Sequence, residues 1–311
     1  MHNSGGRDIL HRWEGNPVIT TDDLSFRCAS IFNAGAVFIG GEVLLLLTIQ
    51  SLEGSYAIYP ARSGDGKNFI VDGQPILAPI ANGPDAIYEK LGILDTRITN
   101  FSGEYFICYD ALSLHGYRLG LAKTTDFETI ERVGIISEPD NKSGVIFPDK
   151  FDGSFARLER PWEGGSIWIS YSNDLLYWGN SDIVMTPRSG YWDCDRIGAA
   201  TPPMATESGW LLIYYGVKRT SAGPLFRLGA AVLDKKNPAR VLGRTNVPIL
   251  SPREDYERIG NMPNLVYSCG AILNPDRTIR LYYGASSSCI ALGTTTVDEL
   301  LSACMNNTRQ P

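Results

Sequence analysis

The stretch GILDTRIT, residues 92–99, places one carboxylate, Asp95, two residues before one guanidinium, Arg97. In a β-strand these side chains point to the same face, because successive side chains alternate between faces. An acid held beside a fixed cation is what chemistry on a sugar or a phosphate ester requires. The alternative is an ordinary surface ion pair at the start of a strand. Which of these two interpretations holds depends on the secondary-structure elements around residues 92–99.

A unit of four β-type runs recurs along the chain. Each copy begins with a turn and a strongly apolar run, at residues 41–50, 103–111, 153–161, 209–217 and 278–286. Each continues with a run that ends near an aspartate, and these aspartates are Asp65, Asp126, Asp174, Asp234 and Asp298. Four-stranded units at this period predict a β-propeller, here with five blades. Two stacked sheets are the alternative, which the repeat of four runs disfavours.

The last unit reaches the end of the chain before its fourth run. The fourth runs of the other units lie at residues 74–79, 133–137, 181–187 and 247–252, and residues 16–20 match them in type. We therefore expect an all-β, five-bladed β-propeller closed by an N-terminal strand, because closure removes open sheet edges. Residues 1–311 would form one domain. Helical patterns appear near residues 298–305 and 85–90.

The composition limits the classes of partner. The 311 residues are 43% hydrophobic and 20% charged, as in a globular protein. A net charge of −6 without a basic run argues against a nucleic-acid partner, and three histidines without a paired-cysteine motif predict no metal and no cofactor. Six scattered cysteines are expected to be free thiols. We see no signal peptide or membrane-spanning run and expect an intracellular protein, cytoplasmic or in another compartment. The oligomeric state stays open.

The first run of each unit is expected to line the channel where the blades meet. These runs are residues 30–40, 93–101, 145–153, 197–206 and 262–273. Strand ends that converge on one axis form a concave site, and tyrosines provide platforms for sugar rings. The candidate substrate contacts from the channel strands and from the ends of the second runs are Asn33, Arg97, Asp149, Lys150, Tyr109 and Tyr215.

Four basic or amide side chains form a second candidate set. They are Arg62, Asn141, Lys142 and Arg160. Each of these residues by itself would be interpreted as an ordinary polar residue of the protein surface. Together, near strand ends of an otherwise acidic protein, they predict a pocket for phosphate or a phosphorylated sugar.

Many ordered blocks of the chain resemble glycoside hydrolase family 130, the β-mannoside phosphorylases and β-mannosidases. The blocks are residues 14–20, 30–36, 94–99, 121–134, 141–150, 167–179, 207–217 and 227–244. The resemblance implies a five-bladed propeller that needs no cofactor. It also implies that Asp95 is the general acid, acting through a hydroxyl of the mannosyl ring, with Arg97 as the arginine of the same motif. The implied partners are a mannooligosaccharide and either phosphate or mannose 1-phosphate, with inversion at the sugar.

Several positions depart from the family pattern and leave three readings open. Thr48 replaces an arginine, while Tyr215 and Glu159 replace histidines. One reading is a β-mannosidase that uses water, with Glu159 in the substrate site as base. A second resembles glycosyltransferase family 108, whose enzymes build and phosphorolyse β-1,2-mannan from mannose 1-phosphate or a nucleotide sugar. A third is a non-catalytic sugar-binding propeller, which the presence of Asp95 disfavours. We favour the second reading, because Asn141, Lys142 and Arg160 preserve an anion pocket.

Overall fold

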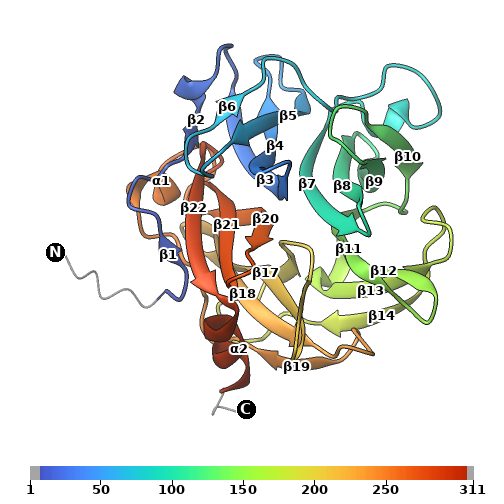
Figure 1. Ribbon diagram of the computed structural model, residues 1–311, viewed down its shortest axis with the longest axis vertical. Coiled ribbons are helices and arrows are strands. Elements are labelled where there is room, and N and C mark those ends of the chain that lie inside the picture. Colours follow the sequence, from blue (N-terminus) through green and yellow to red (C-terminus); the bar gives the residue numbers. More distant parts are fainter. Residues whose placement is uncertain (1–7, 307–311) are drawn as a thin grey trace.

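The computed structural model describes residues 8–306. Residues 1–7, part of the N-terminal segment in which we expected no signal peptide, lie outside that range, as do residues 307–311. Within residues 8–306 the regular structure is predominantly β-strand, and the sheets stand around a common centre (Figure 1). The all-β prediction is therefore confirmed.

Four sheets account for the strands of the described residues. The largest contains β3 (Ser30–Ile39), β4 (Glu42–Gln50), β5 (Tyr56–Ser63), β6 (Ile70–Val71), β7 (Gly92–Phe101), β8 (Glu104–Ser113), β9 (Gly116–Thr124) and β10 (Glu131–Ile135). The second contains β11 (Asn141–Phe151), β12 (Ser154–Pro161), β13 (Ile167–Ser172) and β14 (Gly179–Met185). The third contains β15 (Arg196–Ala199), β16 (Met204–Thr206), β17 (Gly209–Thr220), β18 (Gly223–Leu233) and β19 (Val241–Arg244). The fourth contains β1 (His11–Arg12), β2 (Ile19–Thr20), β20 (Val266–Leu273), β21 (Thr278–Ala285) and β22 (Cys289–Thr296).

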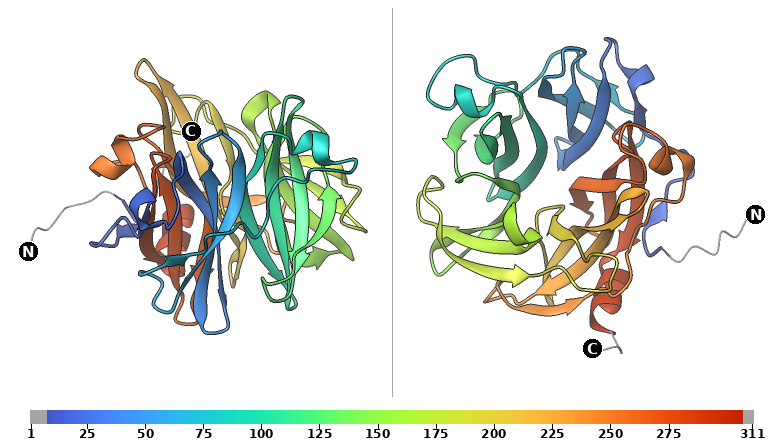
Figure 2. Two further views of the ribbon diagram at one scale, coloured as in Figure 1. Left: turned by 90° about the horizontal axis from the view of Figure 1, so that it is seen from above. Right: turned by 180° about the vertical axis from the view of Figure 1, so that it is seen from behind.

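The eight-stranded sheet divides into two antiparallel groups, β3–β6 and β7–β10. The two groups meet at one parallel pair, between Tyr56 and Gly92. Within each group successive strands pair as the repeat predicts. Figure 2 shows the same arrangement from above and from behind, with the first strands of the groups toward the centre. The predicted channel strands therefore lie where strands of different groups approach one another.

The N-terminal segment pairs with the last strand, as predicted from its likeness to the fourth runs. Ile19 pairs with Ile290 of β22, and His11 pairs with Thr294 of the same strand. Between these pairs, Arg12 donates 2.7 Å and 2.9 Å hydrogen bonds to the two carboxylate oxygens of the fully buried Glu257. The N-terminal segment is thus joined to β22 by strand pairing and to Glu257 by an ion pair.

The turns of the repeat explain its sequence. Ser102 and Gly103, between β7 and β8, have φ values of 53° and 93°. Positive φ at both central residues is the type I′ turn that joins two twisted antiparallel strands, and glycine adopts it without steric cost. The long apolar run that follows each such turn is buried on both faces, as β4 is from Val43 to Ile49.

Four of the five repeated aspartates are turn residues. Asp174 accepts 2.9 Å hydrogen bonds from the backbone N–H groups of Leu176 and Tyr177, which lower the pKa of its carboxyl. The same two-hydrogen-bond turn occurs at Asp65, Asp126 and Asp234. Asp298 instead lies in the first turn of a helix. Four of the five aspartates that recur in the repeat therefore stabilise turns in the loops.

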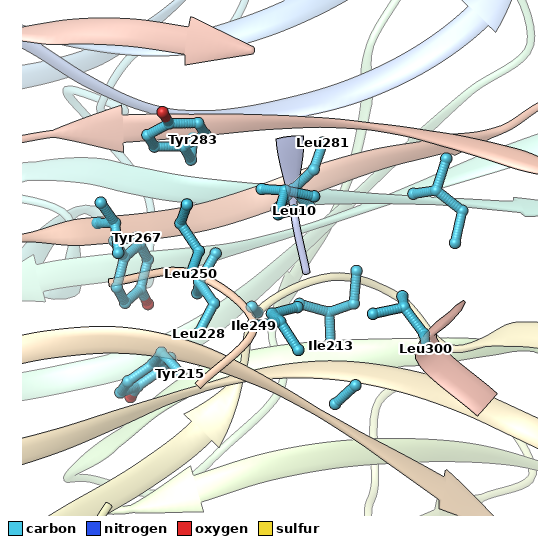
Figure 3. Packing of buried hydrophobic residues seen from close by; sticks show 14 of the residues in the cluster. Leu10, Ile213, Tyr215, Leu228, Ile249, Leu250, Tyr267, Leu281, Tyr283 and Leu300 are labelled. Carbon is cyan, nitrogen blue, oxygen red and sulfur yellow. The ribbon is translucent and has the colours of Figure 1, made fainter. Parts of the chain in front are cut away.

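The core packs between neighbouring sheets. Figure 3 shows one cluster, in which Ile213 of β17 and Leu228 of β18 meet Leu281 of β21. Leu10 from the N-terminal segment and Leu300 from the C-terminal helix complete it. These contacts hold the third and fourth sheets together and pack Leu10 and the C-terminal helix against them.

The helices are short. They are η1 (Thr21–Asp23), η2 (Ala86–Tyr88), η3 (Glu163–Gly165), α1 (Asp255–Arg258) and α2 (Val297–Met305). The predicted helices near residues 85–90 and 298–305 correspond to η2 and α2, whereas α1 was not predicted. No helix in residues 8–306 has the length and apolar character needed to cross a membrane. All six cysteines are free thiols, as expected.

Candidate functional site

A cavity of about 770 Å³ opens where the sheets converge. Its wall includes Asn33 of β3, Asp95 of β7, Lys142 of β11, Tyr215 of β17 and Tyr267 of β20. Each strand group thus contributes a polar side chain to one space. The volume is within the range of roughly 300–1,000 Å³ that is usual for small-molecule sites.

Four of these strands carry a β-bulge or register irregularity near the cavity. The register of β3 shifts at Asn33, that of β7 between Leu94 and Arg97, that of β11 between Lys142 and Val145, and that of β20 between Ser268 and Gly270. Asn33, Asp95 and Ser143 have φ values of 42°, 58° and 58°. A bulge inserts an extra residue and redirects its side chain, and backbone in this sparsely populated region is held by its surroundings. The polar side chains therefore reach the cavity because regular alternation is interrupted.

Asp95 is 4% exposed and is held by neighbours on three other strands, β3, β4 and β11. Its Oδ1 accepts a 2.7 Å hydrogen bond from Asn33 Nδ2, and its backbone N–H donates to Thr48 Oγ1 at 3.0 Å. The Lys142 Nζ atom lies 4.0 Å from Asp95 Oδ2. Thr48 thus helps to fix the backbone of the candidate acid.

Arg97 lies behind the cavity wall and does not line it. Its guanidinium is 1% exposed and donates to the backbone oxygen of Asp95 at 2.8 Å, to that of Ala200 at 3.2 Å and to Tyr267 Oη at 2.8 Å. The bulge separates the two side chains that we predicted to share a face. We correct its predicted role: Arg97 supports Asp95 through the backbone and does not itself line the substrate space.

The basic groups of the cavity are Lys142, Arg160 and Arg196. Arg160 Nε donates a 2.9 Å hydrogen bond to Tyr215 Oη, whereas its buried Nη1 atom has no hydrogen-bond partner among residues 8–306. Burial by itself lowers the pKa of Arg160, but the nearby tyrosines outweigh it, so the pKa is raised and the group stays cationic. A planar guanidinium with a free donor suits a phosphate oxygen.

Lys142 is surrounded by acids and aromatic rings. Its Nζ atom lies 3.6 Å from Asp110 Oδ2 and 4.0 Å from the centre of the Tyr117 ring. Burial alone lowers the pKa of Lys142, but the carboxylates of Asp110 and Asp95 raise it above its ordinary value. Lys142 therefore presents a positive charge beside Asp95.

Aromatic side chains form the remaining wall of the cavity. Tyr56, Tyr117 and Trp162 line it, and Trp162 is 52% exposed. Exposed or half-exposed rings at the mouth of a polar cavity are surfaces on which sugar rings stack. The cavity thus combines one buried acid, three cations and several apolar faces.

The structure does not bring four predicted contacts to the cavity. Arg62 forms ion pairs with Glu42 and Glu128 on β5's outer side, and Asp149 and Lys150 lie exposed at the far end of β11. The predictions for Asp149 and Lys150 assumed that every residue of a channel strand lies near the cavity, whereas only one end of β11 reaches it. Tyr109 is 1% exposed and packs against Gly120, with its hydroxyl bonded to Glu89. It is therefore a core residue.

Asn141 and Glu159 lie next to the site but outside the cavity wall. Asn141 Nδ2 donates a 2.8 Å hydrogen bond to Glu159 Oε2, and the Arg157 guanidinium forms an ion pair with the same oxygen. Asn141 Oδ1 is buried without a hydrogen-bond partner in the described chain. Glu159 is thus already paired with a cation, and it does not line the cavity.

Several residues of the site were missed by the sequence analysis. Tyr267 lay inside a predicted channel strand, and Trp162 directly follows the Arg160–Pro161 pair. Asp110 lies within the apolar second run of its unit, and the sequence does not indicate that it pairs with Lys142. Only the meeting of β8 with β11 identifies it.

Comparison with known proteins agrees with this geometry. A family model described as beta-1,4-mannooligosaccharide phosphorylase, glycoside hydrolase family 130, matches residues 6–306. The chain belongs to glycoside hydrolase family 130. It is thereby an enzyme of the glycoside phosphorylase class. In this family 130 chain Asp95, the predicted acid, lines the cavity.

Two relatives of this family 130 chain are beta-1,2-mannobiose phosphorylases. That of Listeria innocua serovar 6a is 32% identical, over 94% of this chain and 97% of its own length. That of a Thermoanaerobacter species (strain X514) is 33% identical, over 91% and 96%. A solved structure of beta-1,2-mannobiose phosphorylase from Listeria innocua, in complex with beta-1,2-mannobiose, matches with a TM-score of 0.87 at 31% identity. The match covers 96% of this chain and 99% of that one.

Proposed function

We propose that this family 130 enzyme transfers a mannosyl group, with inversion, between β-1,2-linked mannooligosaccharides and phosphate. The observation that carries the proposal is one cavity that holds a buried acid, Asp95, and a buried cation with a free donor, Arg160. Asp95 would supply the proton that the leaving oxygen needs, and Arg160 would bind the phosphate that acts as the nucleophile. The β-1,2 linkage is supported by the relatives, whereas the family description names a β-1,4 substrate.

In the proposed reaction a phosphate oxygen attacks C1 of the mannosyl ring, and the bond from C1 to the bridging oxygen breaks. The bond electrons go to the bridging oxygen. Asp95 gives its proton to a ring hydroxyl, and that hydroxyl gives its own proton to the leaving oxygen. The products are α-mannose 1-phosphate and a shortened oligosaccharide. Lys142 and Arg160 neutralise the charge of the phosphate, and Trp162 provides an apolar face for the sugar.

The reverse reaction would lengthen the oligosaccharide from mannose 1-phosphate. A nucleotide-mannose is the alternative donor. Hydrolysis with Glu159 as base is less well supported, because Glu159 is paired with Arg157 and lies outside the cavity wall. Water would also leave the cationic wall without a role.

We also propose that the sheets are five four-stranded blades of one closed propeller and one catalytic domain. The division of the eight-stranded sheet at Tyr56 and Gly92 supports this count, as does the pairing of the N-terminal strands with β22. A closed ring would fix the five strand ends around the cavity and leave the loops free to vary.

The test is product analysis of β-1,2-mannobiose and β-1,4-mannobiose, each incubated with and without inorganic phosphate. We expect mannose 1-phosphate from the β-1,2 substrate when phosphate is present, and little product without it. Asp95→Asn should reduce turnover by about 100-fold to 10,000-fold while leaving the unfolding midpoint near that of the wild type. The reverse reaction is run with mannose 1-phosphate and with GDP-mannose.

If free mannose were released from the β-1,2 substrate at equal rates with and without phosphate, the enzyme would be a hydrolase and this proposal would be wrong. Lengthening from GDP-mannose but not from mannose 1-phosphate would establish a nucleotide-sugar transferase. Normal turnover by Asp95→Asn would remove Asp95 as the acid.

A further inference from the structure

Asp110 is a buried carboxylate next to the cavity that the proposed reaction does not use. It lies in β8, is fully buried and does not line the cavity. Its Oδ1 accepts a 3.0 Å hydrogen bond from the backbone N–H of Ser143. Its Oδ2 makes no hydrogen bond within residues 8–306 but lies 3.6 Å from Lys142 Nζ. Since Lys142 Nζ is also 4.0 Å from Asp95 Oδ2, the ammonium stands between two carboxylates.

We propose that Asp110 is a positioning residue, which anchors the Lys142 ammonium at the cavity wall and balances the charge that it exerts on Asp95. The proposal rests on the proposed role of Asp95 as the acid. A carboxylic acid beside an uncompensated cation ionises more readily and is then unable to donate a proton. With Asp110 present, the ammonium is shared between two acids. Lys142 can then attract phosphate while Asp110 offsets its charge next to Asp95.

Several titratable and charged groups on the surrounding strands face the Asp110–Lys142–Asp95 cluster. They are Tyr56 of β5, Arg97 of β7, Cys108 of β8, Tyr117 of β9, Arg160 of β12, Tyr215 of β17, and Tyr267 and Cys269 of β20. Burial raises the pKa of Cys108 to about 12 and those of Tyr267 and Cys269 well above their ordinary values. The pKa values of Arg97 and Arg160 are also raised, although burial alone would lower them. These five groups therefore do not titrate near pH 7.

The test is the pH dependence of kcat/KM for β-1,2-mannobiose at a fixed, saturating phosphate concentration. A reaction that needs a protonated acid declines on the alkaline side. We expect Asp110→Asn to move this decline down by about one pH unit, and Lys142→Met to move it up. The double variant should return near the wild-type profile, because both charges are removed. Asp126→Asn, an exposed turn aspartate of the same strand group, is the matched control and should leave the profile unmoved.

A merely structural role for Asp110 predicts a lower rate or unfolding midpoint with an unmoved alkaline decline, and that result would overturn the inference. If Asp110→Asn does not fold, the double variant is compared with Lys142→Met, and coincident profiles would equally overturn it. Asp95→Asn is measured beside them. An inactive Asp95→Asn with an unmoved decline in Asp110→Asn refutes this inference while leaving the proposed function standing, whereas an active Asp95→Asn refutes both.

Discussion

Replacing Arg97 by lysine isolates the geometry of its guanidinium, because the charge is kept. The native side chain donates to Asp95 O, Ala200 O and Tyr267 Oη, which lie on three separate segments. A compact ammonium cannot span the same three acceptors, and we expect it to keep one of them. Hydrogen bonds from a charged group contribute about 1.5–3 kcal/mol each, so the loss of two predicts a destabilisation of about 3–6 kcal/mol.

This loss is a large part of the roughly 5–15 kcal/mol by which domains are stable, so it should appear plainly in urea unfolding. We also expect kcat to fall at least about 10-fold, because Asp95 loses the donor that fixes its left-handed backbone. The matched control is Arg62→Lys, whose half-exposed ion pairs with Glu42 and Glu128 are expected to contribute about 0–1 kcal/mol. An Arg97→Lys variant with the unfolding midpoint and kcat of this control would refute the reasoning.

Two further substitutions test the structural roles that the contacts of Glu159 and Asp174 indicate. Glu159→Gln removes the partner of the buried Arg157, so we expect about 3–5 kcal/mol of destabilisation in urea while kcat for phosphorolysis stays within about threefold. A loss of about 100-fold or more would instead identify Glu159 as a catalytic base. Asp174 has a lowered pKa because backbone N–H groups bond its carboxylate, so its stabilisation is complete above the unfolded value of about 3.9 and is lost as the pH falls through the folded value. Asp174→Ala should therefore lower the thermal midpoint at pH 7 and differ progressively less from the wild type below about pH 4; a constant difference across that range would contradict this account.

Part of the site followed from residue type and order. Asp95 and the basic pair Lys142 and Arg160 were predicted from their positions in the repeat, and all three line one cavity. The predicted contacts Asn33 and Tyr215 line it as well. Position along a strand was a poor guide to the remaining candidates. Asp149 and Lys150 belong to the same strand as Lys142 but lie at its exposed end. A strand of eleven residues spans far more than the width of a cavity, so membership in a channel strand does not decide contact.

The sequence by itself determined the strand pattern, the turns and the pairing of the N-terminal segment with the last strand. These depend on local chemistry: glycine after Ser102 for a type I′ turn, Asp174 for a hydrogen-bonded loop, and a fourth-run pattern at residues 16–20. Local rules act within a few residues, so they can be read in order along the chain.

Only the tertiary structure decided which side chains share the cavity. The bulges at Asn33 and Asp95 break the two-residue alternation, so Arg97 turns away from the face that the sequence gives it. Asp110 and Lys142 are 32 residues apart and become an ion pair because β8 and β11 pack together. Bulge positions and contacts between sheets depend on the packing of distant strands, which no local pattern records.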